Sequence, residues 1–174
     1  MPTPRRRKAN ERTSMIPEST GATPFGIFLL ADEYLEAART SFTSRSALTC
    51  GPTRLLAYHS CELFLKTYMR SHGKLIPELR AFQHDLPAML AEAIKIGLQP
   101  KKGMLRAFNA LAKDNDYVRV RYSLDTNAVH VRAENAIKLA EKVRESVRAA
   151  LNFDELGNPN GELWGGPLPA DYPK

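Results

Sequence analysis

Apolar side chains recur every three or four positions from about residue 24 to residue 151, which is the periodicity of helices with one buried face. The pattern predicts helices over residues 24–44, 52–71, 85–97, 100–114 and 133–151. The connections between them are short, which favours antiparallel neighbours. We therefore predict an all-α fold, a five-helix antiparallel bundle of the four-helix type.

The second predicted helix is apolar on nearly every side, which is typical of a helix in the middle of a bundle. Its large side chains are Leu55, Leu56, Tyr58, Cys61, Leu63, Phe64, Leu65, Tyr68 and Met69. Glu62 and Lys66 lie four residues apart on this helix, a spacing at which opposite charges pair.

Residues 117–122 break the helical pattern, because Tyr117-Val118-Arg119-Val120-Arg121-Tyr122 alternates apolar and basic side chains. Alternation predicts an extended segment. Two arginines between aromatic residues can bind phosphate and stack bases. In the alternative interpretation, both tyrosines anchor the segment to the core and the arginines face water.

The ends of the chain differ in composition from the middle. Residues 1–23 are rich in Pro, Ser, Thr and charge, which predicts a flexible arm whose basic run, residues 5–8, is either solvated or contacts RNA. Residues 152–174 contain turn signals and predict an irregular tail, whose Trp164 and Tyr172 could dock on the bundle or on a second copy. The predicted bundle spans residues 24–151.

The net charge of +6 belongs to the predicted bundle, since the arm (+3) and the tail (−3) cancel. A basic surface favours phosphate-bearing or acidic partners. The longest apolar stretch, Phe25–Ala31, is far shorter than the ~20 residues of a membrane span, and no signal-peptide pattern follows the basic run. We expect a cytoplasmic protein that does not bind membranes.

Cys50 and Cys61 are separated by eleven positions on one predicted helix, about 16 Å, and a disulfide needs Cα atoms within about 7 Å. Buried free thiols are expected. The sequence contains no metal-ligand cluster, Gly-rich phosphate loop or dinucleotide fingerprint, so we expect neither a metal nor a cofactor.

Three local patterns resemble the HEPN family of small prokaryotic helical domains. They are residues 54–66 of the central helix, His84-Asp85-Leu86 at the start of the next helix, and Arg121-Tyr122-Ser123. The resemblance covers about residues 25–150. It implies a HEPN-like bundle that often forms a homodimer, with roles in RNA cleavage, nucleotide binding, toxin–antitoxin pairs or phage defence. It also implies a nucleotidyltransferase partner, as for many members, and other members have lost catalysis.

The family's ribonucleases are marked by Arg, four to six residues, then His, in which imidazole moves protons and guanidinium holds phosphate. Here Arg121 and His130 have eight residues between them, too many for the motif, so we commit to no catalytic residue. Arg121 and His130 are an acid–base pair only in the minority hypothesis; otherwise they are solvated loop residues.

Arg54 and His59 match the bare spacing, but Leu55 follows the arginine, and an offset of five residues turns about 140° beyond a full circle. We predict a hydrogen-bonded core histidine at 59 and a surface arginine at 54. Asp85 is predicted to cap its helix, and His84 is a candidate for binding phosphate or base.

Three functions are compatible with these patterns and with the HEPN resemblance. The first is a HEPN-like module, without catalysis, that binds RNA, a nucleotide or a partner protein. The second is a metal-independent endoribonuclease, and the third is a structural protein-interaction domain with no role on nucleic acid. The candidate binding residues are Tyr117, Arg119, Arg121, Tyr122 and His84.

Overall fold

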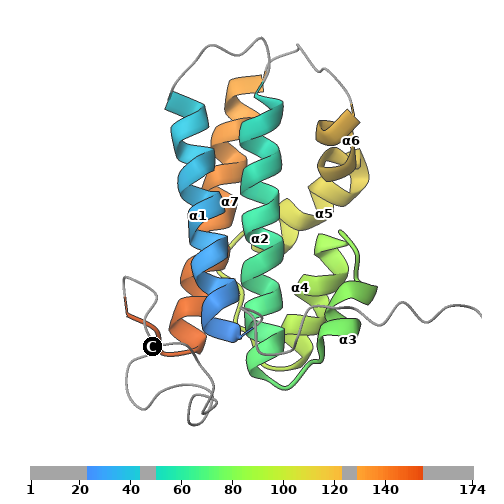
Figure 1. Cartoon of the computed structure of the whole chain (residues 1–174). Coiled ribbons are helices and arrows are strands. Elements are labelled where there is room, and N and C mark those ends of the chain that lie inside the picture. The colour runs from blue at the N-terminus through green and yellow to red at the C-terminus, as the bar shows by residue number, and fades with distance from the viewer. Residues whose placement is uncertain (1–22, 44–49, 123–128, 155–174) are drawn as a thin grey trace, which may run out of the picture.

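A computed structural model of the chain describes residues 23–43, 50–122 and 129–154. These residues form an all-α fold of seven helices (Figure 1). The helices are α1 (Pro24–Thr43), α2 (Gly51–Ser71), α3 (Ile76–Ala81), α4 (Leu86–Lys95), α5 (Met104–Asp114), α6 (Asp116–Tyr122) and α7 (Val129–Ala150). The predicted fold class is therefore confirmed. The predicted count of five is not, because α3 and α6 are additional short helices.

The long helix α2 lies between the α1–α7 pair and the shorter helices α3 to α6 (Figure 1). Contacts from Ser41 to Thr53 (3.0 Å between hydroxyls) and from Ser60 to the Ala31 carbonyl (2.9 Å) show that α1 and α2 are antiparallel. Since α7 is also antiparallel to α1, α2 and α7 run in the same direction. The predicted antiparallel arrangement is wrong for α2 and α7, which are parallel because α3 to α6 carry the chain back between them.

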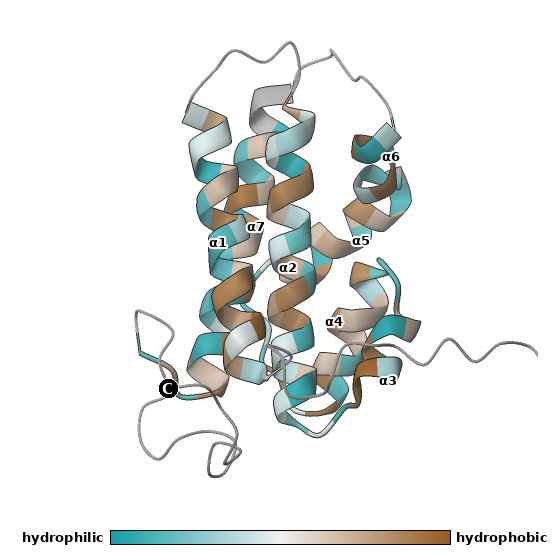
Figure 2. Cartoon of the chain, in the orientation of Figure 1, coloured by the Kyte–Doolittle hydropathy of each residue, from teal (hydrophilic) through white to brown (hydrophobic). Residues whose placement is uncertain are grey.

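Apolar side chains close the space between α2 and its neighbours. Figure 2 shows hydrophobic and hydrophilic segments alternating along the helices, as expected when each has a buried and an exposed side. The largest fully buried apolar side chains are Phe28, Phe64, Phe108, Leu35, Leu65, Met69, Leu86, Met89, Leu90, Leu98 and Met104. They include residues of α2 that its sequence predicted to be central.

Two polar residues fix the starts of helices, and the sequence predicted one of them, Asp85. The Thr23 hydroxyl accepts a hydrogen bond from the Gly26 amide (3.0 Å), and the Asp85 carboxylate accepts one from the Ala88 amide (2.9 Å). Helix α5 begins after Gly103 and ends at Asn115, both with left-handed backbone (φ 86° and 48°). The turn at Asn115 lets α6 leave in a new direction.

Helix α6 contradicts the prediction of an extended segment at residues 117–122. The same residues can also form a short helix that buries one side against its neighbours and exposes the other. Asp116, Tyr117 and Val120 lie on the buried side, whereas Val118 and Tyr122 face outward and are 40% and 83% exposed. Burial of these three side chains against neighbouring helices decides the conformation, and the alternation alone does not reveal it.

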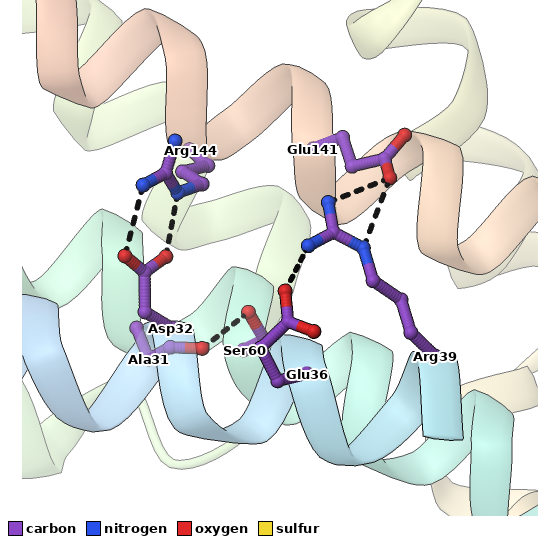
Figure 3. A network of polar contacts seen from close by, with 7 residues as sticks. All are labelled: Ala31, Asp32, Glu36, Arg39, Ser60, Glu141 and Arg144. Atoms are coloured by element: carbon purple, nitrogen blue, oxygen red, sulfur yellow. Dashed lines mark hydrogen bonds and ion pairs between the residues drawn. The ribbon is translucent and has the colours of Figure 1, made fainter. Parts of the chain in front are cut away.

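Ion pairs join α1 to α7 (Figure 3). Arg144 donates two hydrogen bonds to Asp32 (2.6 and 3.0 Å), and Arg39 donates to Glu141 (2.8 and 3.3 Å). We call these two pairs the α1–α7 ion pairs. Their side chains are partly exposed, between 21% and 41%.

Other predictions have mixed outcomes. Cys50 and Cys61 are buried thiols that are not joined in a disulfide, as expected. None of the helices in the described residues is long and apolar enough to span a membrane. The predicted arm (residues 1–23, apart from Thr23), most of the predicted tail with Trp164 and Tyr172, and Ser123 lie outside the described residues.

Candidate functional site

A cluster of polar side chains is buried between α2, α6 and the loop that precedes α4. We call it the polar cluster; it consists of Arg54, Tyr58, His59, Glu62, Lys66, His84, Asp116 and Tyr117. Charged side chains are seldom buried unless they are paired. The cluster divides into two groups of contacts, one around Asp116 and one around Glu62.

The first group fixes the start of α6 to α2. Arg54 donates to both oxygens of Asp116 (2.9 and 3.2 Å), and the Tyr58 hydroxyl donates to Asp116 Oδ2 (2.6 Å). Arg54 and Asp116 are only 1% and 5% exposed. Burial, and then the hydrogen bond to Asp116, raise the pKa of Tyr58 far above its usual value, so this hydroxyl stays protonated and donating.

The second group surrounds the carboxylate of Glu62, which is 2% exposed. Lys66 donates to Glu62 Oε1 (2.6 Å). Glu62 Oε2 lies within hydrogen-bond distance of the Tyr117 hydroxyl (2.8 Å) and of His84 Nδ1 (3.0 Å). Burial alone would raise the pKa of the Glu62 carboxyl, but His59, Lys66 and His84 outweigh it and hold that pKa well below its usual range. Glu62 is therefore ionised.

His59 completes this second group. Its Nδ1 lies 3.2 Å from the Tyr117 hydroxyl and 3.8 Å from Glu62 Oε2, and its ring packs edge-on against Tyr34 (4.5 Å between centroids). The prediction of a hydrogen-bonded histidine is right, but the side chain is 30% exposed and is not a core residue. Burial, and then the charge of Glu62, raise the pKa of Tyr117 far above its usual value.

The prediction for Arg54 is wrong. It was expected on the surface, yet it is the largest fully buried side chain of the described residues. The reason is Asp116, which reaches Arg54 across 62 positions. Because Asp116 holds Arg54 inside the protein, the Arg54–His59 spacing does not present a guanidinium to a phosphate.

A surface pocket of about 360 Å³ opens beside the second group. Its apolar wall comes from Phe82, Leu86, Pro87, Leu111 and Val118, and His84, Tyr117 and Asn115 add polar groups. Gln83 has a left-handed backbone (φ 50°), which turns the chain just before His84. The next residue, Asp85, caps α4. His84 is thus positioned by its backbone turn as well as by Glu62.

The remaining candidate residues of α6 are outside the pocket lining, and one of them contacts a lining residue. The Arg121 guanidinium stacks over the Tyr117 ring (4.4 Å from carbon to centroid), a cation–π contact. Tyr122 lies one helical turn beyond Val118, which lines the pocket, and Arg119 is exposed. Tyr117 itself is 5% exposed, so it supports Arg121 and cannot stack a base.

Of the five predicted binding residues, His84 and Tyr117 line the pocket and Arg121 stacks on Tyr117. Arg119 and Tyr122 are exposed residues of α6 that do not line it. His130 belongs to the first turn of α7, and its side chain lies outside the described residues. Among the described residues, no group of three or more His, Cys, Asp or Glu side chains could hold a metal ion.

The family model of the HEPN domain matches residues 28–150, which is most of the chain. The chain belongs to the HEPN family. No curated protein and no solved structure matched significantly. The three segments that carry the HEPN resemblance are far apart in sequence, and in the structure each contributes to the site: Glu62 from the central helix, His84 from the second segment, and Arg121 from the third.

HEPN membership fits a module that acts on nucleotides, RNA or a protein partner. The sequence identified His84 and the α6 residues but missed Arg54, Tyr58, Glu62 and Asp116 as parts of the site. One signal was present: Arg54, Glu62 and Lys66 are charged positions on a helix whose large side chains are mostly apolar, and buried charges must find partners.

Proposed function

We propose that this HEPN domain binds a single-stranded RNA segment or a nucleotide at the face formed by α6 and the His84 loop, without cleaving it. The observation that carries the proposal is the pocket beside a fixed cation: Arg121 is held over the Tyr117 ring next to a pocket of about 360 Å³. An apolar pocket with a few convergent polar groups is the usual form of a small-ligand site.

The chemistry of this face suits nucleic acid. Arg121 and the exposed Arg119 supply positive charge for phosphate, and Tyr122 at 83% exposure offers an aromatic face for a base. The net charge of +6 on residues 24–151 adds a long-range attraction for phosphate.

The absence of cleavage in this proposal is supported by two features. The Arg54 guanidinium is occupied by Asp116, which also accepts a hydrogen bond from Tyr58. Arg121 and His130 are separated by more residues than the family's ribonuclease motif allows. Incubation of the purified protein with RNA in EDTA tests this part: intact RNA is expected, and cleavage that vanishes in Arg121→Ala and in His130→Ala would establish the endoribonuclease instead.

Binding is tested by fluorescence anisotropy with a labelled single-stranded RNA at several salt concentrations. Replacing Arg119 and Arg121 together by alanine is expected to weaken binding roughly tenfold at low salt and to flatten the salt dependence. The matched control is Lys95→Ala with Lys138→Ala, which removes the same charge from exposed positions on α4 and α7. Equal binding by parent and α6 variant would refute the proposed site.

Homodimer formation and a nucleotidyltransferase partner belong to this proposal as well, and they are supported by family membership. Leu29 and Leu30 on α1 are 38% and 44% exposed, an apolar surface that a second copy could cover. Light scattering coupled to size-exclusion chromatography is expected to give twice the mass of 19.4 kDa, and a monomer at all concentrations would exclude the dimer.

A further inference from the structure

His84 has one ring nitrogen committed to the protein interior. Its Nδ1 lies 3.0 Å from Glu62 Oε2. An ionised carboxylate can only accept hydrogen bonds, so the proton of a neutral His84 ring must be on Nδ1, and the tautomer is assigned by this network. In that tautomer Nε2 carries a lone pair and is an acceptor. Glu62 thereby decides the hydrogen-bonding character of the opposite side of the ring.

The opposite side of the ring is the side available to a ligand. His84 lines the pocket, and 46% of its side chain is exposed although Nδ1 faces the buried Glu62. The edge of the ring that bears Nε2 is therefore directed away from Glu62. The Tyr117 ring stands at 78° to the His84 ring with 5.7 Å between centroids, so the ring is held on a second side.

Two of the neighbouring polar groups in the pocket are already used within the protein. The Tyr117 hydroxyl donates to Glu62, and the Asp85 carboxylate caps α4. His84 differs from these two because its second hydrogen-bonding atom is not consumed by the bond that orients it. A ligand in the pocket meets an oriented acceptor. Arg121, which is stacked over the Tyr117 ring, can bind a phosphate of the same ligand.

We infer that Nε2 of His84 accepts a hydrogen bond from the bound ligand, so that the site selects ligands with a hydroxyl or amino donor close to a phosphate. This inference rests on the proposed function, since it concerns the same site. In RNA the donor can be the ribose 2′-hydroxyl or the exocyclic amino group of a base. If it is the hydroxyl, the protein prefers RNA to DNA of the same sequence. Glu62 is then a positioning residue, because it acts only through His84.

The test uses the full chain and a short labelled oligouridylate in ribo, 2′-deoxy and 2′-O-methyl forms, at mildly alkaline pH. Uracil has no exocyclic amino group, and a 2′-O-methyl oxygen cannot donate. The ribo form is expected to bind about tenfold more tightly than the other two, because they leave the acceptor unpaired. A second pair of ligands tests the amino donor. It consists of oligoadenylate and an oligonucleotide of the same length built from purine riboside, which lacks the exocyclic amino group.

His84→Asn is the informative variant. The asparagine amide replaces Nδ1 as a donor to Glu62 and has no atom in the place of Nε2. The variant is expected to melt within a few degrees of the parent and to bind the preferred and non-preferred forms equally. His72→Asn, which changes an exposed imidazole at the end of α2, is the control and is expected to keep the preference.

Each outcome decides something. A ribo preference, or an amino preference in the purine pair, that His84→Asn abolishes supports the inference and names the donor. A parent that binds all forms equally, or a His84→Asn variant that keeps the preference, overturns the inference and leaves RNA binding intact. A parent that binds no form at all contradicts the proposed function and this inference with it.

Discussion

Two sets of charged contacts hold this bundle together, and they differ in burial and in what lies beside them. The α1–α7 ion pairs join two neighbouring long helices at partly exposed positions (Figure 3). The polar cluster joins α2 to a seven-residue helix, α6, and its central charges are 5% exposed or less. Exposed pairs contribute little because water and salt screen them.

The difference teaches what each set can do. A partly exposed pair adds to the packing of α1 against α7 and can be lost at small cost. A buried pair must recover the cost of removing two charges from water, and it is therefore sensitive to the loss of either partner. The short helix α6 depends on such bonds, and the bonds around Glu62 also hold His84 in the pocket wall and Tyr117 beneath Arg121.

The largest expected effect is at Arg54. Arg54→Met leaves the Asp116 carboxylate buried without its cation, which is expected to cost about 3–5 kcal/mol of unfolding free energy. Urea unfolding followed by circular dichroism measures it. The double variant Arg54→Met with Asp116→Asn is expected to recover part of the loss, since no unpaired charge remains. A loss below about 1 kcal/mol in the single variant would mean that Asp116 is solvated.

An intermediate effect is expected at Glu62. Glu62→Gln removes the negative charge that accepts hydrogen bonds from Lys66, His84 and Tyr117. The expected loss of unfolding free energy at neutral pH is about 1.5–3 kcal/mol. The pKa of Glu62 is lower in the folded chain than in the unfolded chain. The stability that it contributes is therefore complete above about pH 4.5, the ordinary carboxyl range, and declines as the pH falls toward the folded value.

Unfolding curves for parent and Glu62→Gln at neutral and acidic pH measure this dependence. The difference in stability between the two proteins is expected to narrow with acidification. A difference that stays constant down to acidic pH would show that the Glu62 charge does not stabilise the fold.

The smallest expected effect is at the α1–α7 ion pairs. Glu141→Gln keeps the shape of the side chain and removes the charge facing Arg39; the two side chains are 37% and 41% exposed. The expected loss is below about 1 kcal/mol, and it should shrink further at high salt. Thermal unfolding at low and high salt measures it. A loss as large as that of Arg54→Met would remove the contrast between the two sets.

The sequence predicted the parts of this picture that depend on local spacing. The periodicity located the long helices, Asp85 was identified as a cap, and Glu62 was paired with Lys66 four residues away. The link from Glu62 to His84 spans 22 positions and the link from Arg54 to Asp116 spans 62. Such partners are chosen by how the helices pack, and no local pattern carries that information.

Residues 117–122 show why local patterns can mislead. Apolar and basic side chains alternate there as in a strand. The segment is nevertheless a helix, because Asp116 accepts a hydrogen bond from α2 and Tyr117 donates one to α2. The same tertiary contacts changed the interpretation of Tyr117, from a surface that stacks bases to a support for Arg121.

Our central claim is that the polar cluster positions a ligand site in addition to stabilising the fold. An amide NMR titration of the full chain with a short single-stranded RNA tests this claim most directly. We expect the signals of His84, Val118 and Arg121 to shift with added RNA, while those of Glu141 and Arg144 on the α1–α7 side stay in place. Shifts confined to the α1–α7 side, with none around His84 and α6, would contradict the claim.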